Sequence, residues 1–148
     1  MRIRPLLTVF VSFVLACTAV APALAGGSIA GGVYTSGGNG TAATGAGVML
    51  STSNAVPLVP VSVGLTGFAP LARGGGYAVT ADGRFALGGD ALGVGYGVGQ
   101  FGGAHSSGVA TAFFDHQVAP LTSIELRGYF PTGTHAATAG FLGLKFSL

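Results

Sequence analysis

The chain has 148 residues, of which 28 are glycine, 49% are hydrophobic and only 7% are charged, with a formal net charge of +2. This length indicates a single domain, and the charged fraction lies far below the roughly 25% of an average soluble protein. The composition excludes an ordinary cytosolic enzyme with a charged surface, and the high apolar content excludes a disordered, highly charged chain.

The first 25 residues have the pattern of a secretory signal peptide. A pair of arginines precedes an apolar stretch over residues 6–20, and a small-x-small cleavage site ends at Ala25. The apolar stretch is too short for a membrane-spanning helix, which needs about 20 residues. We therefore predict that residues 1–25 are removed and that residues 26–148 form one domain.

The predicted mature domain is electrically neutral and has no cysteine. Cys17, the only cysteine, lies in the predicted signal peptide, so no disulfide can form within one chain. Four basic and four acidic side chains remain, namely Arg73, Arg84, Arg127, Lys145, Asp82, Asp90, Asp115 and Glu125. This balance predicts neither a nucleic-acid partner nor a polybasic membrane patch.

Hydrophobic residues in the mature domain recur at every second position, which is the period of a β-strand and not of a helix. Residues that favour turns separate the alternating runs. We predict eight strands, near 27–35, 42–51, 59–68, 76–87, 91–101, 108–118, 123–130 and 137–148, with a turn at Thr52-Ser53-Asn54.

Three of these strands contain residues that need comment. Pro60 lacks an amide donor, which the third strand tolerates if it effectively begins at Val61. Asp82-Gly83 is a typical hairpin turn, but splitting 76–87 there scatters its apolar face, so we keep one strand. In the fifth strand every second residue over 93–99 is glycine, which would leave room for arginine or tyrosine side chains opposite.

Charged residues in the predicted strands fall on the face opposite the large aliphatic residues, although the face of Asp115 is less clear. The charges on that face are Asp82, Arg84, Glu125, Arg127 and Lys145. So few charges cannot solubilise a surface, but they can pair inside a narrow lumen. Strands of this length suit a tilted membrane crossing, and only a closed barrel satisfies every backbone group in lipid. We predict an all-β fold, an eight-stranded antiparallel up-and-down transmembrane β-barrel.

Residues 26–148 resemble the small eight-stranded outer-membrane β-barrel proteins of Gram-negative bacteria. The resemblance rests on the signal peptide, the strand count and a C-terminal alternating run similar to the terminal strand signal that the family's assembly machinery reads. That run contains Leu142, Leu144, Phe146 and Leu148. The family usually ends in Phe or Trp and has aromatic girdles; this chain ends in Leu and has no Trp. Its aromatic residues near strand ends on one rim are Phe68, Tyr77, Phe101 and Phe130.

The resemblance implies a monomer in the cell outer membrane, in contact with the lipid bilayer, lipopolysaccharide and the assembly machinery. With both termini periplasmic, the outer loops would be 36–41, 69–75, 102–107 and 131–136. We expect a structural or surface-interaction role, with the lumen closed by packed side chains and salt bridges. A turn centred near His135 would place Glu125 opposite Lys145 and Arg127 opposite Gly143.

Three alternatives to that role remain open. The interior charges suit an ion path or gate as well as a structural network. His105 and Ser107, with Glu125, resemble the His-x-Ser pair and glutamate of outer-membrane lipid A deacylases, although Gly108 stands where that motif has Asn. A soluble exported β-sandwich that binds a partner through glycine-rich loops is the third. The sequence predicts no cofactor and no metal site, since its three histidines lack ligand spacing.

Overall fold

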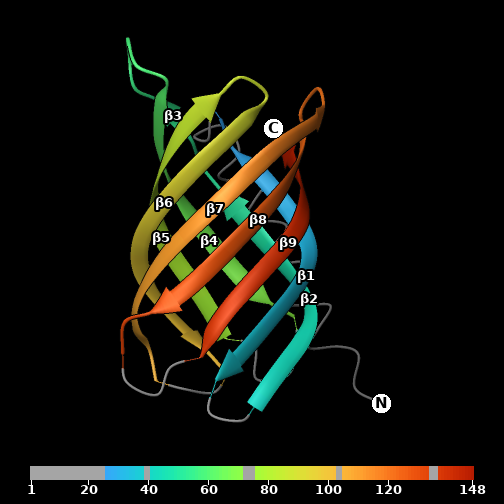
Figure 1. Ribbon diagram of the computed structural model, residues 1–148, viewed down its shortest axis with the longest axis vertical. Coiled ribbons are helices and arrows are strands. Elements are labelled where there is room, and N and C mark those ends of the chain that lie inside the picture. Colours follow the sequence, from blue (N-terminus) through green and yellow to red (C-terminus); the bar gives the residue numbers. More distant parts are fainter. Residues whose placement is uncertain (1–25, 39–40, 72–75, 103–104, 134–136) are drawn as a thin grey trace.

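The computed structural model describes residues 26–38, 41–71, 76–102, 105–133 and 137–148. The predicted signal peptide and His135 therefore lie outside the described residues. Figure 1 shows one antiparallel sheet that curls into a barrel. Its strands are β1 (Ser28–Gly38), β2 (Thr41–Ser51), β3 (Asn54–Ala55), β4 (Val61–Pro70), β5 (Gly76–Leu87), β6 (Asp90–Phe101), β7 (Ser107–Ala119), β8 (Thr122–Pro131) and β9 (Thr138–Ser147). Within the described ranges no helix is long and apolar enough to cross a membrane.

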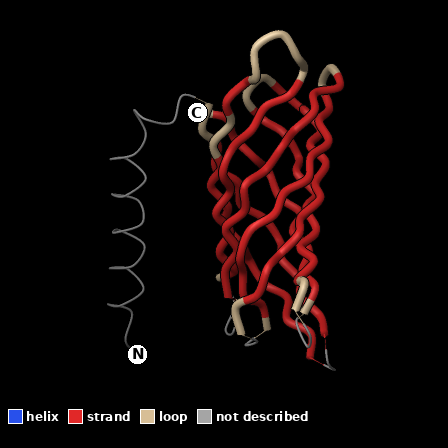
Figure 2. Tube along the Cα trace, turned by 90° about the vertical axis from the view of Figure 1, so that its left-hand side faces the viewer, coloured by secondary structure: helices blue, strands red, loops and turns tan. Residues whose placement is uncertain are grey.

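The sheet is a closed ring of eight long strands, to which β3 is a short addition. Strands adjacent in the chain pair antiparallel, β1 closes the ring by pairing with β9, and β2 pairs directly with β4. Each long strand therefore has a hydrogen-bonded neighbour on both sides, and Figure 2 shows the strands running obliquely around the barrel. The predicted eight-stranded antiparallel barrel is confirmed. The alternative of a β-sandwich is wrong, because two stacked sheets would leave unpaired edge strands.

The observed strands match the predicted ones to within three residues at each end. β5 spans Gly76–Leu87 as predicted, so Asp82-Gly83 lies inside a strand and forms no turn. The third long strand, β4, begins at Val61 and not at residue 59. Pro60 precedes it, so its missing amide donor removes no hydrogen bond from within β4.

The turn predicted at Thr52-Ser53-Asn54 is wrong, because the chain reverses further on. Asn54 pairs with Val63 in β4, in the register that β2 and β4 already share. The Val56 amide donates to the Val61 carbonyl at 2.9 Å, so the chain reverses direction over the four residues between them, 57–60. Two of those four residues are prolines, which fix the backbone and cannot continue a ladder.

The two ends of the barrel are distinguished by what they carry. The terminal end holds Gly27 and Leu148, which are joined by a main-chain hydrogen bond of 2.9 Å. It also holds the connections over 52–60, 88–89 and 120–121. The loop end holds the four connections that the sequence predicted to lie together, and parts of these lie outside the described residues.

Side chains alternate between the interior and the outer surface of the barrel, as strand geometry requires. Val94 faces outward and is 67% exposed, whereas Arg127 faces inward and is 1% exposed. The large apolar residues exposed on the long strands form what we call the outer apolar band. They are Ile29, Val33, Val63, Leu65, Tyr77, Val79, Phe85, Leu87, Leu92, Val94, Tyr96, Val98, Phe114, Val118, Ile124, Leu126, Phe130, Leu142, Leu144 and Phe146.

The inward-facing glycines of β6 make room for side chains from both neighbouring strands. A Cβ atom at Gly93 would overlap the Phe113 ring of β7, and one at Gly95 would overlap the Asp82 carboxylate of β5. The space beside these two glycines thus takes Phe113 and Asp82, while Arg84, which pairs with Gly93 in register, is an arginine of the predicted kind opposite. β6 lies between β5 and β7, so the inward residues of those two strands are the ones that fill it.

We predict that Gly93→Ala destabilises the barrel by about 1–3 kcal/mol, the usual cost of overpacking a filled interior. Gly83→Ala is the matched control, because its Cβ would face outward with its nearest neighbour 4.0 Å away. Urea unfolding of the refolded barrel in detergent micelles, followed by circular dichroism, measures both. Equal stability of the two variants would contradict this account of the glycines.

Candidate functional site

The half of the lumen nearer the loop end is filled by aromatic side chains, which we call the aromatic layer. Its members, Tyr34, Phe68, Phe101, Tyr129 and Phe141, are each at most 2% exposed. Phe68 contacts the other four, with ring centroids 5.1 to 6.4 Å apart. Such contacts fill the lumen at this level, as expected for an eight-stranded barrel.

Two of the four aromatic residues that the sequence placed near strand ends on one rim belong to this interior layer. Phe68 and Phe101 both lie near the loop end, but each is only 2% exposed. Each lies an even number of residues from the inward-facing residues of its strand, so alternation turns both side chains into the lumen. The other two, Tyr77 and Phe130, face outward and are 39% and 49% exposed.

The half of the lumen nearer the terminal end contains six charged side chains, which we call the charge layer. They are the five predicted residues and one further aspartate: Asp82, Arg84, Asp115, Glu125, Arg127 and Lys145. Three are acidic and three are basic, so the layer is neutral when all are ionised. The predicted convergence of the five interior charges is therefore what the structure shows.

Arg127 lies at the centre of the charge layer. Its Nε donates to Glu125 Oε1 at 2.6 Å, and its Nη1 donates to Asp82 Oδ2 at 2.7 Å. Its guanidinium carbon also lies 4.0 Å from the centroid of the Phe113 ring, a cation–π contact. Arg127 is 1% exposed and Glu125 is fully buried, so these are desolvated ion pairs supported by hydrogen bonds.

Lys145 and Arg84 complete the pairing on the side nearer the terminal end. Lys145 Nζ donates to Asp115 Oδ2 at 2.8 Å and to Glu125 Oε2 at 2.9 Å. Arg84 also pairs with Asp115 Oδ2, at 2.5 Å. Asp82 further accepts hydrogen bonds from threonine hydroxyls of β4 and β5, at 2.6 and 2.7 Å. Each buried charge is thus neutralised by a partner, as burial requires.

The predicted register between the last two strands is wrong by two residues. Glu125 lies opposite Gly143 and not Lys145, and Arg127 lies opposite Phe141 and not Gly143. A shift of two residues leaves every side chain on its predicted face, because alternation has a period of two. Lys145 therefore still reaches Glu125, but diagonally across the strands.

Asp115 is the member of the charge layer that the sequence did not assign. It is 4% exposed and lies opposite Glu125 in the β7–β8 register. The apolar pattern is weak in β7, because its outward side has small Ala110 and Ala112 whereas bulky Phe113 faces inward. Asp115 lies four residues after Thr111 and two after Phe113, so all three share one face of β7. Thr111 and Phe113 would identify that face as inward once the barrel is known.

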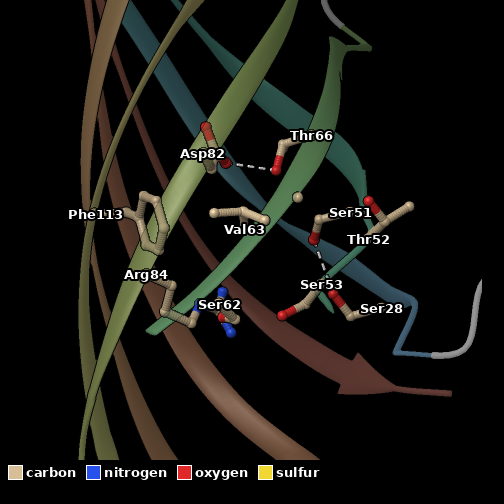
Figure 3. Close-up of a pocket in the computed structure, with 11 residues that line it drawn as sticks. Ser28, Ser51, Thr52, Ser53, Ser62, Val63, Thr66, Asp82, Arg84 and Phe113 are labelled. Carbon is tan, nitrogen blue, oxygen red and sulfur yellow. Dashed lines mark hydrogen bonds between the residues drawn. The ribbon is translucent and has the colours of Figure 1, made fainter. Parts of the chain in front are cut away.

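A recess of about 310 Å³ opens at the terminal end, on the β5–β9 side of the mouth, with Arg84, Asp115 and Lys145 at its inner wall. A second cavity of about 20 Å³ lies on the β4 side, and Arg84 borders both. Figure 3 shows this smaller cavity, where Ser62 lies near Arg84 and Thr66 is bonded to Asp82. Beyond the recess lie the buried charge layer and the aromatic layer, so the described lumen is closed.

The residues suggested for acyl hydrolysis do not assemble. Glu125 pairs in register with Asp115. Asp115 lies eight residues along β7 from Ser107, which separates them by about 26 Å at the usual rise of a strand. Glu125 is also fully buried and bonded to Arg127 and Lys145. His105 and Ser107 remain at the loop end. In the described ranges no three His, Cys, Asp or Glu side chains are grouped to hold a metal.

We predict that Glu125→Gln destabilises the barrel by about 3–5 kcal/mol, because it leaves buried cationic groups without their counter-charge. Asp90→Asn is the matched control, since it breaks the exposed ion pair with His116 and should cost about 0–1 kcal/mol. The double variant E125Q/K145Q restores neutrality, so its loss should be smaller than the sum of its single losses. Urea unfolding in micelles measures all of these, and equal losses for E125Q and D90N would contradict a paired charge layer.

Comparison with known proteins gives a fold and no sequence family. No protein-family model and no curated protein sequence matches the chain. Among solved structures, Neisserial surface protein A aligns with 83% of this chain and 95% of its own, with a TM-score of 0.59 and 12% identity. Ail, the attachment invasion locus protein of Yersinia pestis, aligns with 83% of this chain and 98% of its own, with a TM-score of 0.61 and 15% identity. The chain therefore has the fold of the small eight-stranded outer-membrane β-barrels.

Proposed function

We propose that residues 26–148 form an integral protein of a Gram-negative outer membrane, with a structural or surface-interaction role and no catalytic activity. The observation that carries this proposal is the inverted distribution of polarity. Large apolar side chains cover the outside of the barrel, and six paired charges lie within it, five of them buried. A soluble protein has the opposite arrangement, because exposed apolar area is unfavourable in water.

The height of the outer apolar band agrees with that of a membrane barrel. On β5 the band runs from Tyr77 to Leu87, so it covers ten residue steps. Ten steps rise about 33 Å along a strand, or about 25 Å along the axis at a tilt near 40°, and outer-membrane barrels have an apolar band about 25 Å tall.

The remaining elements of the proposal concern export and orientation. Residues 1–25 would direct export and be removed, and the outward-facing run of Leu142, Leu144 and Phe146, with exposed Leu148, would be read by the assembly machinery. The terminal end would be periplasmic and the loop end would face the medium, beside lipopolysaccharide. The comparison proteins are named for the cell surface and for attachment, which supports placing any surface contact of this chain at the loop end.

We predict that Val63→Glu blocks membrane assembly, because it places a carboxylate on the lipid side of β4. Ser62→Glu is the matched control on the adjacent inward position, where Ser62 lies opposite Arg84. The measurement is the fraction of protein recovered in the outer membrane that shows heat-modifiable gel mobility. Equal recovery of the two variants would show that β4 does not face lipid at Val63.

The non-catalytic role predicts that Ser107→Ala and His105→Ala leave the acylation of lipid A unchanged when either replaces the wild-type chain in the producing cell. Mass spectrometry of extracted lipid A measures this, and cells lacking the chain supply the reference. A loss of deacylated lipid A in the variants would restore the hydrolase alternative.

A further inference from the structure

The loop that joins β3 to β4 is apolar, uncharged and highly exposed. The four residues at its tip, over which the chain reverses, are Pro57-Leu58-Val59-Pro60. Leu58 is fully exposed and Val59 is 49% exposed. Figures 1 and 2 both show this loop extending past the other connections at the terminal end. An aliphatic side chain held at such a tip is unfavourable if only water surrounds it.

Leu58 also has a strained backbone. Its φ is +70°, in the left-handed region, which is unfavourable for a residue other than glycine. Glycine or asparagine would fit this position at lower cost. Strain of this kind persists where the surrounding structure fixes the backbone, and here the tight reversal between Pro57 and Pro60 holds the Leu58 side chain outward.

The loop continues the outer apolar band beyond the end of β4. Val63 and Leu65 belong to the band, and continuing the β4–β5 register places Val59 beside Leu87, another member. Leu58 lies three residues past Val61, about 10 Å along a strand and less along the axis of a tilted barrel. The interfacial layer of a bilayer extends about 5–7 Å beyond the hydrocarbon on each side. The tip therefore reaches that layer.

Elsewhere on the same rim polar groups interrupt the band, and on β7 only Val118 of the band lies beyond them. On β6 and β7 the next outward residues after Leu92 and Phe114 are Asp90 and His116. Their side chains form an exposed pair, with His116 Nδ1 2.6 Å from Asp90 Oδ1. The terminal rim is therefore asymmetric: it is wholly apolar at the β3–β4 loop, whereas a polar pair interrupts the band at β6–β7.

We propose that the loop over residues 57–60 is a membrane-interface anchor, in which Leu58 and Val59 insert into the headgroup and glycerol layer of the leaflet at the terminal end. This inference rests on the proposed function, since it needs a bilayer around the outer apolar band. A lipid surface fits better than a protein partner because the loop is continuous with the band.

Introduced tryptophans test the anchor, because the chain contains no tryptophan. Leu58→Trp, Leu121→Trp and Val94→Trp are each refolded into phosphatidylcholine vesicles that contain lipids brominated at a shallow or a deep position. Leu121 is the matched control: it is a leucine with φ +62° at the same end, but it borders the polar recess. We expect shallow bromine to quench the emission of L58W strongly, with a blue shift. Deep bromine should quench V94W, and L121W should stay water-exposed.

The outcomes separate this inference from the proposed function. Absence of quenching in V94W would overturn the membrane span itself. Quenching in V94W with water-like emission in L58W would overturn only the anchor and leave the loop for a protein partner. Equal quenching in L58W and L121W would overturn the asymmetric rim. If L58W fails to fold, Leu58→Cys in a chain without the first 25 residues carries a single thiol for a polarity-sensitive fluorophore, with the same expectations.

Discussion

The structure depends on the narrow lumen of an eight-stranded ring. Closing the sheet satisfies the backbone hydrogen bonds of every long strand, but it turns half of the side chains into a space only wide enough for side chains to fill. That constraint accounts for inward glycines beside large neighbours such as Phe113. It also accounts for the close contacts of the aromatic layer around Phe68.

Charges can occupy this lumen only as a neutral set. Arg127 alone would be an uncompensated buried cation, but Glu125 and Asp82 hold it from two strands and Phe113 lies against its face. The cost of desolvation is offset because each charge has a counter-charge and directed hydrogen bonds. The aromatic layer closes the other half of the lumen, so the barrel is a filled scaffold with a shallow recess at one mouth.

The outside of the barrel follows a different rule, because it exposes large apolar side chains on seven of the eight long strands. The polar pair of Asp90 and His116 interrupts that band on one side, while the loop around Leu58 prolongs it on the other. The same alternation that places Glu125 inside places Leu126 outside, so interior pairing and exterior apolarity come from one strand period.

Alternation, composition and turn residues were enough to predict the eight strands and the inward face of five of the six charges, because these are local properties with a period of two. The closed ring was predicted from the need to satisfy every backbone group in lipid. The pairing of those charges was not local. The register that sets Glu125 opposite Gly143 depends on how the strands align around the ring. The reversal at 57–60 likewise needed the continued β2–β4 register. Only the tertiary structure decides these features, because a shift of two residues preserves every face and so leaves no mark on the sequence pattern.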